Sequence, residues 1–267
     1  MNRNNVWLKI MPIAFCCLIV QGCAVMPVKV DIAAKPDYDD KSSSSLEKGM
    51  GYTGYYYMLL NFKSVDDQKT VNRLDRIGAR LSHYTERPNI RYKYFIIDTK
   101  YRNAFSLPDG YIFISNSLIE TLGDDEKLAF VVAHEIAHVT HKHLLQSYQR
   151  LNDYSPLKSI LGQKVYILAT ELSYDKAYEF QADQTALRYV YRAGFDTRAS
   201  LDTLGLLKKT QEEDLNEYKK NKTQTKKKDE SPIRHPYIEN RIVNARSYLE
   251  EVYRTEEVQY KPEDFNF

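Results

Sequence analysis

The spacing of apolar residues predicts helices over most of the chain after its first 45 residues. One clear case is the segment 65–84, whose apolar residues share one helical face: Val71, Leu74, Ile77 and Leu81. Asp124 is expected to cap the start of one helix, and Gly194 to follow the end of another. The predicted helices are 46–62, 65–84, 116–122, 124–150, 163–172, 176–193, 197–210 and 236–253.

Three short segments have the alternation and the aromatic content of strands. They are residues 90–97, 103–107 and 111–115. The last two flank Pro108-Asp109-Gly110, residues typical of a tight turn, and are predicted to form a hairpin. We therefore expect an α+β fold that is mostly helical, with a small antiparallel sheet beside the helix at 124–150.

The helix at 124–150 contains His134-Glu135-Ile136-Ala137-His138 within an apolar run. Residues four apart share one face of a helix, so both imidazoles can bind one metal ion. Glu135 follows the first histidine, where its carboxylate can reach a metal-bound water. The alternative is a surface helix that happens to carry two histidines. A zinc hydrolase needs a third protein ligand and an open fourth position.

Glu179 and Asp183 are candidates for that third ligand, because they are four apart in the helix at 176–193. One carboxylate can bind the metal, and the other can accept a hydrogen bond from the far nitrogen of a ligating histidine. Such an acid pair alone would indicate a solvated helix face. Together with His134 and His138, it favours a metal site.

Several separated blocks resemble the HtpX/BepA/Oma-type zinc metalloendopeptidases, the gluzincin family that also contains the CaaX prenyl protease. The first resembles the family's N-A-F-x-x-P-x-G strand region, and the last its H-P…R-I segment. In chain order the blocks are 103–114, 133–143, 179–183, 193–196 and 235–242. The resemblance covers roughly residues 65–250 and implies a zincin-like domain.

The resemblance implies one Zn2+ ion per chain, with His134, His138 and Glu179 as ligands. It implies that Glu135 is the catalytic base and that Asp183 orients His134. It also implies that an extended peptide pairs with a sheet edge, expected at four residues: Tyr111, Ile112, Phe113 and Ile114. The alternative for these four is an ordinary core strand.

His235 has three interpretations. In related proteases the equivalent histidine can occupy the fourth zinc position and hold the enzyme inactive. It could instead stabilise the oxyanion, as could Arg241. Alternatively, His235-Pro236 is a purely structural turn.

The N-terminus has the pattern of a bacterial lipoprotein signal. Arg3 and Lys9 precede an apolar stretch at 10–20, about 11 residues, which is too short for a bilayer of about 30 Å. The residues before Cys23 resemble a lipobox, with cleavage before this cysteine and lipid attached to it; an uncleaved signal anchor is the alternative. Ala24 resembles the second residue of lipoproteins sent to the outer membrane.

The predicted organisation is a signal peptide at 1–22, a flexible tether at 23–45 and one peptidase domain at 46–267, with a charged mobile loop at 211–231. The lysines of that loop could touch anionic lipid headgroups or simply be solvated. Lys and Arg number 38 and Asp and Glu 36, so the charge balance does not indicate a nucleic-acid partner.

These observations predict a lipid-anchored zinc metalloendopeptidase on the periplasmic face of the outer membrane, cutting unfolded or misfolded envelope proteins. The competing hypothesis is a non-catalytic or weakly catalytic chaperone or scaffold for outer-membrane protein assembly.

Overall fold

Three strands form a small mixed sheet in the computed structural model, which describes residues 43–153, 175–222 and 235–256. They are β1 (Lys93–Ile97), β2 (Ala104–Leu107) and β3 (Tyr111–Ser115), in the order β1-β3-β2. β2 and β3 form the predicted antiparallel hairpin through a short 3-10 turn, η1 (Pro108–Gly110). β1 runs parallel to β3, so the sheet is not wholly antiparallel as expected. The reason is that the chain reverses twice between β1 and β3, once before β2 and once at η1.

β3 is the central strand, so the expectation that it forms a substrate-binding edge is wrong. Tyr111, Ile112, Phe113 and Ile114 each have a register partner on both β1 and β2. A strand whose backbone pairs on both sides has no free row of hydrogen-bonding groups to offer a peptide. Residues 63–65 pair beside β1. The amide of Val65 donates to the carbonyl oxygen of Ile96, and the amide of Asp98, just after β1, donates to that of Lys63. Among the described strands, β2 therefore has the edge that no other segment pairs along.

The two faces of the sheet belong to two hydrophobic clusters, as the two-residue period of a strand requires. On β3, Ile112 and Ile114 face a large cluster that includes α4, whereas Phe113 faces a smaller one that includes α1. Gly51 of α1 lets this helix approach η1 closely, since a Cβ there would lie 2.2 Å from the carbonyl oxygen of Pro108. The sheet is thus covered on both faces.

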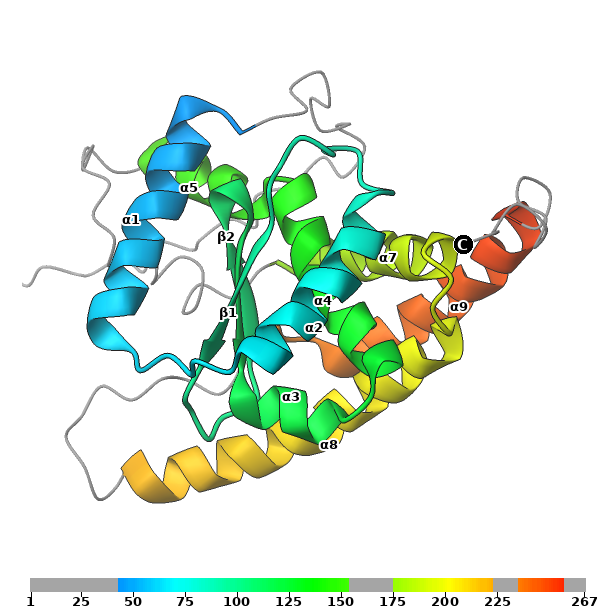
Figure 1. Cartoon of the computed structure of the whole chain (residues 1–267). Coiled ribbons are helices and arrows are strands. Elements are labelled where there is room, and N and C mark those ends of the chain that lie inside the picture. The colour runs from blue at the N-terminus through cyan, green and yellow to red at the C-terminus, as the bar shows by residue number, and fades with distance from the viewer. Residues whose placement is uncertain (1–42, 154–174, 223–234, 257–267) are drawn as a thin grey trace, which may run out of the picture. The chain divides into compact units, whose positions relative to one another are not determined.

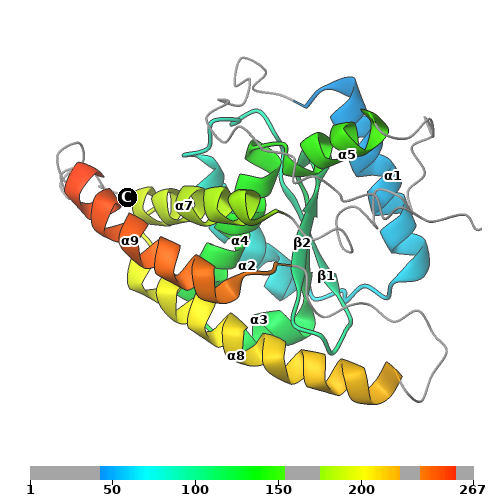
Figure 2. The same cartoon turned by 180° about the vertical axis from the view of Figure 1, so that it is seen from behind.

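Helices make up most of the rest of the described chain (Figures 1 and 2). They are α1 (Ser45–Asn61), α2 (Gln68–Ser82), α3 (Asn116–Leu122), α4 (Asp125–Thr140), α5 (His143–Asp153), α7 (Lys176–Arg192), α8 (Thr197–Lys222) and α9 (Ile238–Glu256). Asp124 caps α4 and Gly194, at φ 71°, follows α7, as predicted. None of the described helices has both the length and the apolar content that a bilayer span requires.

Two helix boundaries differ from the predictions. The segment 124–150 is two helices, because Lys142 adopts a left-handed conformation (φ 56°) between α4 and α5. α8 continues to Lys222, so residues 211–222 are helical and not part of a loop. The apolar stripe fades there, but the Lys and Glu residues that replace it are good helix formers. The predicted helix at 163–172, residues 223–231 and everything before residue 43 lie outside the described residues.

α4 is the centre of the large cluster. It contacts α7, α8, α2 and β2, and every residue from Leu128 to Thr140 is buried. The close packing of α4 with α7 places the two helices that carry the candidate ligands side by side, as both cartoon views show.

Candidate metal centre

α4 and α7 bring three predicted metal ligands into one buried cluster. Nε2 of His134 lies 2.9 Å from Nε2 of His138. The carboxylate oxygens of Glu179 lie 3.7 Å from each of these two nitrogens. The two histidines are four residues apart on α4, and α7 supplies the glutamate from the facing surface. The structure thus places together the residues that the sequence pattern selected.

These residues fit a zinc ion. A tetrahedral zinc ion with bonds of about 2.0–2.1 Å keeps its ligand atoms about 3.3 Å apart. The donor atoms of His134, His138, Glu179 and His235 all lie within 4.8 Å of one another. Burial, helped by the neighbouring His134 and His143, lowers the pKa of His138 well below its usual value, so its ring is neutral, as a metal ligand must be. Imidazole and carboxylate donors are also the ligand types that zinc accepts.

Glu135 lies beside this cluster with its side chain almost fully buried. Its Oε1 is 3.2 Å from Nε2 of His235. Its Oε2 is buried and has no hydrogen-bond partner among the residues that the structure describes. Burial acts to raise the pKa of Glu135, but the charge of His235 and its hydrogen bond bring the pKa below the usual value. Glu135 is therefore an ionised carboxylate with one acceptor atom left for a proton donor.

Asp183 lies behind His134, outside the donor cluster. Its Oδ1 is 2.9 Å from Nδ1 of His134, so Nδ1–H can donate to it while Nε2 faces the metal position. Burial opposes ionisation of Asp183, but the Arg241 guanidinium and its hydrogen bonds hold the pKa of this carboxyl well below its usual range. Asp183 can therefore fix the ring orientation and tautomer of His134.

Arg241, from α9, is bound to acidic side chains. It donates to both carboxylate oxygens of Asp183 at 2.7 Å, and its Nη1 lies 2.9 Å from Glu179 Oε2. Its side chain is 2 % exposed. These contacts give Arg241 the role of holding the Asp183 and Glu179 carboxylates in place, which differs from the oxyanion role considered from the sequence.

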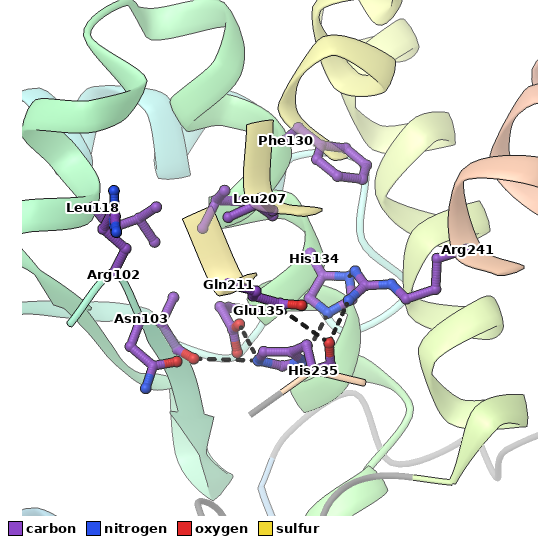
Figure 3. Close-up of a pocket in the computed structure, with 12 residues that line it drawn as sticks. Arg102, Asn103, Leu118, Phe130, His134, Glu135, Leu207, Gln211, His235 and Arg241 are labelled. Atoms are coloured by element: carbon purple, nitrogen blue, oxygen red, sulfur yellow. Dashed lines mark hydrogen bonds and ion pairs between the residues drawn. The ribbon is translucent and has the colours of Figure 1, made fainter. Parts of the chain in front are cut away.

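The His235 ring enters the donor cluster, beside His134 and Glu135 (Figure 3). Its Nδ1 is 3.2 Å from Nε2 of His134 and 3.1 Å from Glu179 Oε1. Its Nε2 is 3.2 Å from the carbonyl oxygen of Ala104 on β2. Burial acts to lower the pKa of His235, but the Glu179 and Glu135 carboxylates raise it to about 10. Of the three interpretations, this position agrees best with a fourth ligand, which His235 becomes when its Nδ1 proton is lost as the metal binds.

A pocket opens beside Glu135, between the start of β2, α4 and α8 (Figure 3). Arg102 forms one wall and is held by α8, where its side chain pairs with Asp214 and Glu213. Gln211 of α8 donates to the carbonyl oxygen of His235 at 3.3 Å. The region predicted as a loop is thus, in part, a wall of the candidate site.

His143 is a residue of the site to which the sequence analysis assigned no role. The side chain is fully buried, and its Nδ1 lies 2.8 Å from Nδ1 of His138. Burial lowers its pKa to about 3, so the ring is neutral. The available signal was a histidine placed directly before Leu144-Leu145, in an apolar setting where a polar ring needs a partner.

Comparisons with known proteins find similarity to metallopeptidases. The sequence model of "Peptidase family M48" matches residues 68–155, which include His134, Glu135 and His138. The beta-barrel assembly-enhancing protease of Escherichia coli (strain K12) is 25% identical over 200 residues, covering 66% of this chain and 41% of that protein. The protein of the same name from Yersinia pestis is 22% identical over 236 residues, covering 79% of this chain and 46% of that protein.

A mitochondrial relative is similar over a shorter stretch. The metalloendopeptidase OMA1 of Bos taurus is 30% identical over 125 residues, which are 39% of this chain and 24% of that protein. The chain spans less than half the length of each of these relatives.

Proposed function

Because the chain belongs to peptidase family M48 through the domain matched at residues 68–155, we propose that it is a zinc-dependent metalloendopeptidase. The observation that carries this proposal is the buried cluster of His134, His138 and Glu179 donor atoms, with the ionised carboxylate of Glu135 beside it. Ligands, base and orienting partners are all present in one place, which is what hydrolysis of a peptide bond needs.

The mechanism assigns a separate task to each side chain. A zinc ion held by His134, His138 and Glu179 would polarise the scissile carbonyl and bring the pKa of a water to about 7. Glu135 accepts the proton of the attacking water at Oε2, which has no partner among the described residues, and delivers it to the leaving nitrogen. Asp183 keeps His134 oriented during these steps.

The edge of β2 is the best-supported place for the substrate backbone. Its first residue, Ala104, lies in the pocket that also contains Glu135 and His134, and its carbonyl oxygen already accepts a hydrogen bond from a side chain outside the sheet. An extended peptide added to this edge would be held through its backbone, with little dependence on sequence. Unfolded polypeptides are therefore the substrate class that this edge suits.

We also propose that the conformation with His235 in the cluster is a resting state. In it, His235 adds a nitrogen to the donor set and its Nε2 takes the Ala104 carbonyl that a substrate backbone would use. Exchanging His235 for Ala should raise the rate of casein cleavage. A lower rate would instead favour an assisting role in the transition state.

The central test is Glu135→Gln in the purified chain. The amide keeps the size of the side chain but cannot take the proton, so zinc should stay bound while casein cleavage is lost. Glu120→Gln, on the exposed surface of α3, is the matched control and should cleave normally. Wild-type cleavage by the Glu135→Gln protein would refute the assignment.

Metal dependence supplies a second test. Treatment with a chelator should abolish cleavage, and addition of one equivalent of zinc should restore it. A chain that binds no zinc, shows no chelator-sensitive cleavage and still prevents aggregation of unfolded clients would favour the chaperone or scaffold hypothesis.

The proposed setting is the bacterial envelope, with lipid on Cys23 holding the domain at the periplasmic face of the outer membrane and unfolded or misfolded envelope proteins as substrates. The support is the lipobox-like sequence before Cys23 and the similarity to proteases named for β-barrel assembly. Cells expressing the wild-type chain and a Cys23→Ser variant can be labelled with a fatty-acid analogue and fractionated. Equal labelling of both would exclude lipidation at this residue.

A further inference from the structure

His143 contacts the ring nitrogen of His138 that lies away from the metal cluster. Its Nδ1 lies 2.8 Å from Nδ1 of His138, and its Nε2 lies 3.0 Å from Oε1 of Gln181 on α7. His143 is 0 % exposed, and its ring stacks on Tyr178 with centroids 4.2 Å apart and an interplanar angle of 12°. The three polar side chains form one line of hydrogen bonds that starts at the metal cluster and ends on α7.

We propose that His143 is a positioning residue that sets the tautomer of His138. The inference rests on the proposed metal centre. For Nε2 of His138 to offer its lone pair to the metal, its Nδ1 must carry the proton and donate to His143 Nδ1. His143 then carries its own proton on Nε2 and donates it to Gln181 Oε1. Hydrogen-bond donation therefore runs in one direction, from His138 to His143 and from His143 to Gln181.

The opposite placement of the two protons would prevent His138 from binding a metal ion. If His143 carried its proton on Nδ1, it would donate to His138, whose proton would then lie on Nε2 and face the cluster. The acceptor oxygen of Gln181 disfavours that arrangement, because it leaves two acceptors facing each other at 3.0 Å. With its amide oxygen facing His143, Gln181 favours the Nε2–H tautomer of His143, and that tautomer favours the Nδ1–H tautomer of His138.

The break between α4 and α5 makes this contact possible. Residues five apart on a continuous helix point about 140° away from each other, so His143 would diverge from His138. Lys142, at φ 56°, ends the regular helix and lets His143 turn back. Tyr178 and Gln181, three residues apart on α7, then hold the ring from one helix face.

The two histidine ligands are therefore oriented by different chemistry. His134 donates to the ionised carboxylate of Asp183, which is a common partner for a metal-binding histidine. His138 donates to a neutral imidazole. A neutral acceptor passes no net charge to the ligand, so the two sides of the centre differ in their electron donation to the metal.

The test measures zinc affinity of the full chain by competition with a chromophoric chelator, independently of cleavage. His143→Phe keeps the stacking on Tyr178 but removes the acceptor, and zinc should bind about 10- to 100-fold more weakly. His143→Asn places an amide oxygen near the former Nδ1 and should recover most of the affinity. Thr185→Val removes the buried hydrogen bond to His141 instead and should leave zinc affinity unchanged.

Gln181 provides a second pair of variants that leaves the buried ring in place. Gln181→Glu keeps an acceptor and should keep wild-type affinity, whereas Gln181→Met removes the acceptor and should weaken binding. The absorption spectrum of the cobalt-substituted chain should change in His143→Phe and return in His143→Asn.

The outcomes separate this inference from the proposed function. Wild-type zinc affinity in both His143→Phe and Gln181→Met, or an Asn variant as weak as the Phe variant, overturns the positioning role alone. A wild-type chain with no affinity for zinc overturns the proposed function and this inference together.

Discussion

The buried ion pair between Arg87 and Glu47 is expected to contribute strongly to stability. The two side chains are 0 % and 1 % exposed. Nη1 of Arg87 lies 2.8 Å from Glu47 Oε1, and Nη2 lies 3.2 Å from Oε2. Nη1 also donates to the carbonyl oxygen of Val139 at 3.1 Å. The pair therefore joins the first turn of α1 to the end of α4.

Exchanging Arg87 for Met would leave the Glu47 carboxylate buried without its guanidinium. Removing one partner of a buried pair costs about 3–5 kcal/mol in the free energy of unfolding. For a domain of this size, about 2–4 °C is lost per kcal/mol, so the melting temperature should fall by about 6–20 °C. Urea unfolding followed by circular dichroism measures the free energy directly.

A double variant and a surface control test the reasoning. Arg87→Met combined with Glu47→Leu removes both charges, and most of the lost stability should return. Lys63→Met breaks a pair whose members are 80 % and 37 % exposed, so its free energy of unfolding should stay close to that of the wild-type chain. If Arg87→Met cost less than about 1 kcal/mol, or if the double variant were as unstable as the sum of the single ones, the reasoning would be refuted.

Three further predictions concern packing, pH and the metal. Gly51→Ala should lower the free energy of unfolding by about 1–3 kcal/mol, because its Cβ meets the Pro108 carbonyl at 2.2 Å; Gly49→Ala, with nothing within 4 Å, should not. Burial lowers the pKa of His141 to about 3, below the unfolded value of about 6.5. The unfolded chain therefore binds the proton first, and stability should fall as pH drops from 6.5 toward 3; His141→Gln should flatten this slope. Asp183→Asn should weaken zinc binding about 10- to 100-fold in equilibrium dialysis, and an unchanged affinity would contradict the orienting role.

The parts of the site that the sequence predicted are those governed by local helix geometry. His134 and His138, like Glu179 and Asp183, are four apart, and the helical period places each pair on one face whatever the rest of the chain does. Their resemblance to a known family supplied the remaining step, that the two helices face each other. The same local rule predicted the β2–β3 hairpin from its turn residues.

The parts that sequence reasoning missed depend on tertiary contacts. The contact between His143 and His138 needs the left-handed residue Lys142, which no apolar pattern marks. The central place of β3 depends on where β1 docks, and a hairpin looks the same from its sequence whichever strand pairs on its other side. The extension of α8 is stabilised by Arg102, whose side chain pairs with Asp214 from more than 100 residues away in the chain.

The complete burial of α4 between Leu128 and Thr140 has a consequence for how the centre can be switched. Backbone amides of such a segment exchange with deuterium mainly when the whole domain opens, whereas frayed or exposed segments exchange through small local fluctuations. His134, Glu135 and His138 therefore sit in the slowest-exchanging part expected of the molecule. His235, on the other hand, reaches the cluster from just before α9, outside that helix. A local fluctuation can therefore move His235 into or out of the metal centre. The same kind of fluctuation cannot move α4, the helix that carries Glu135.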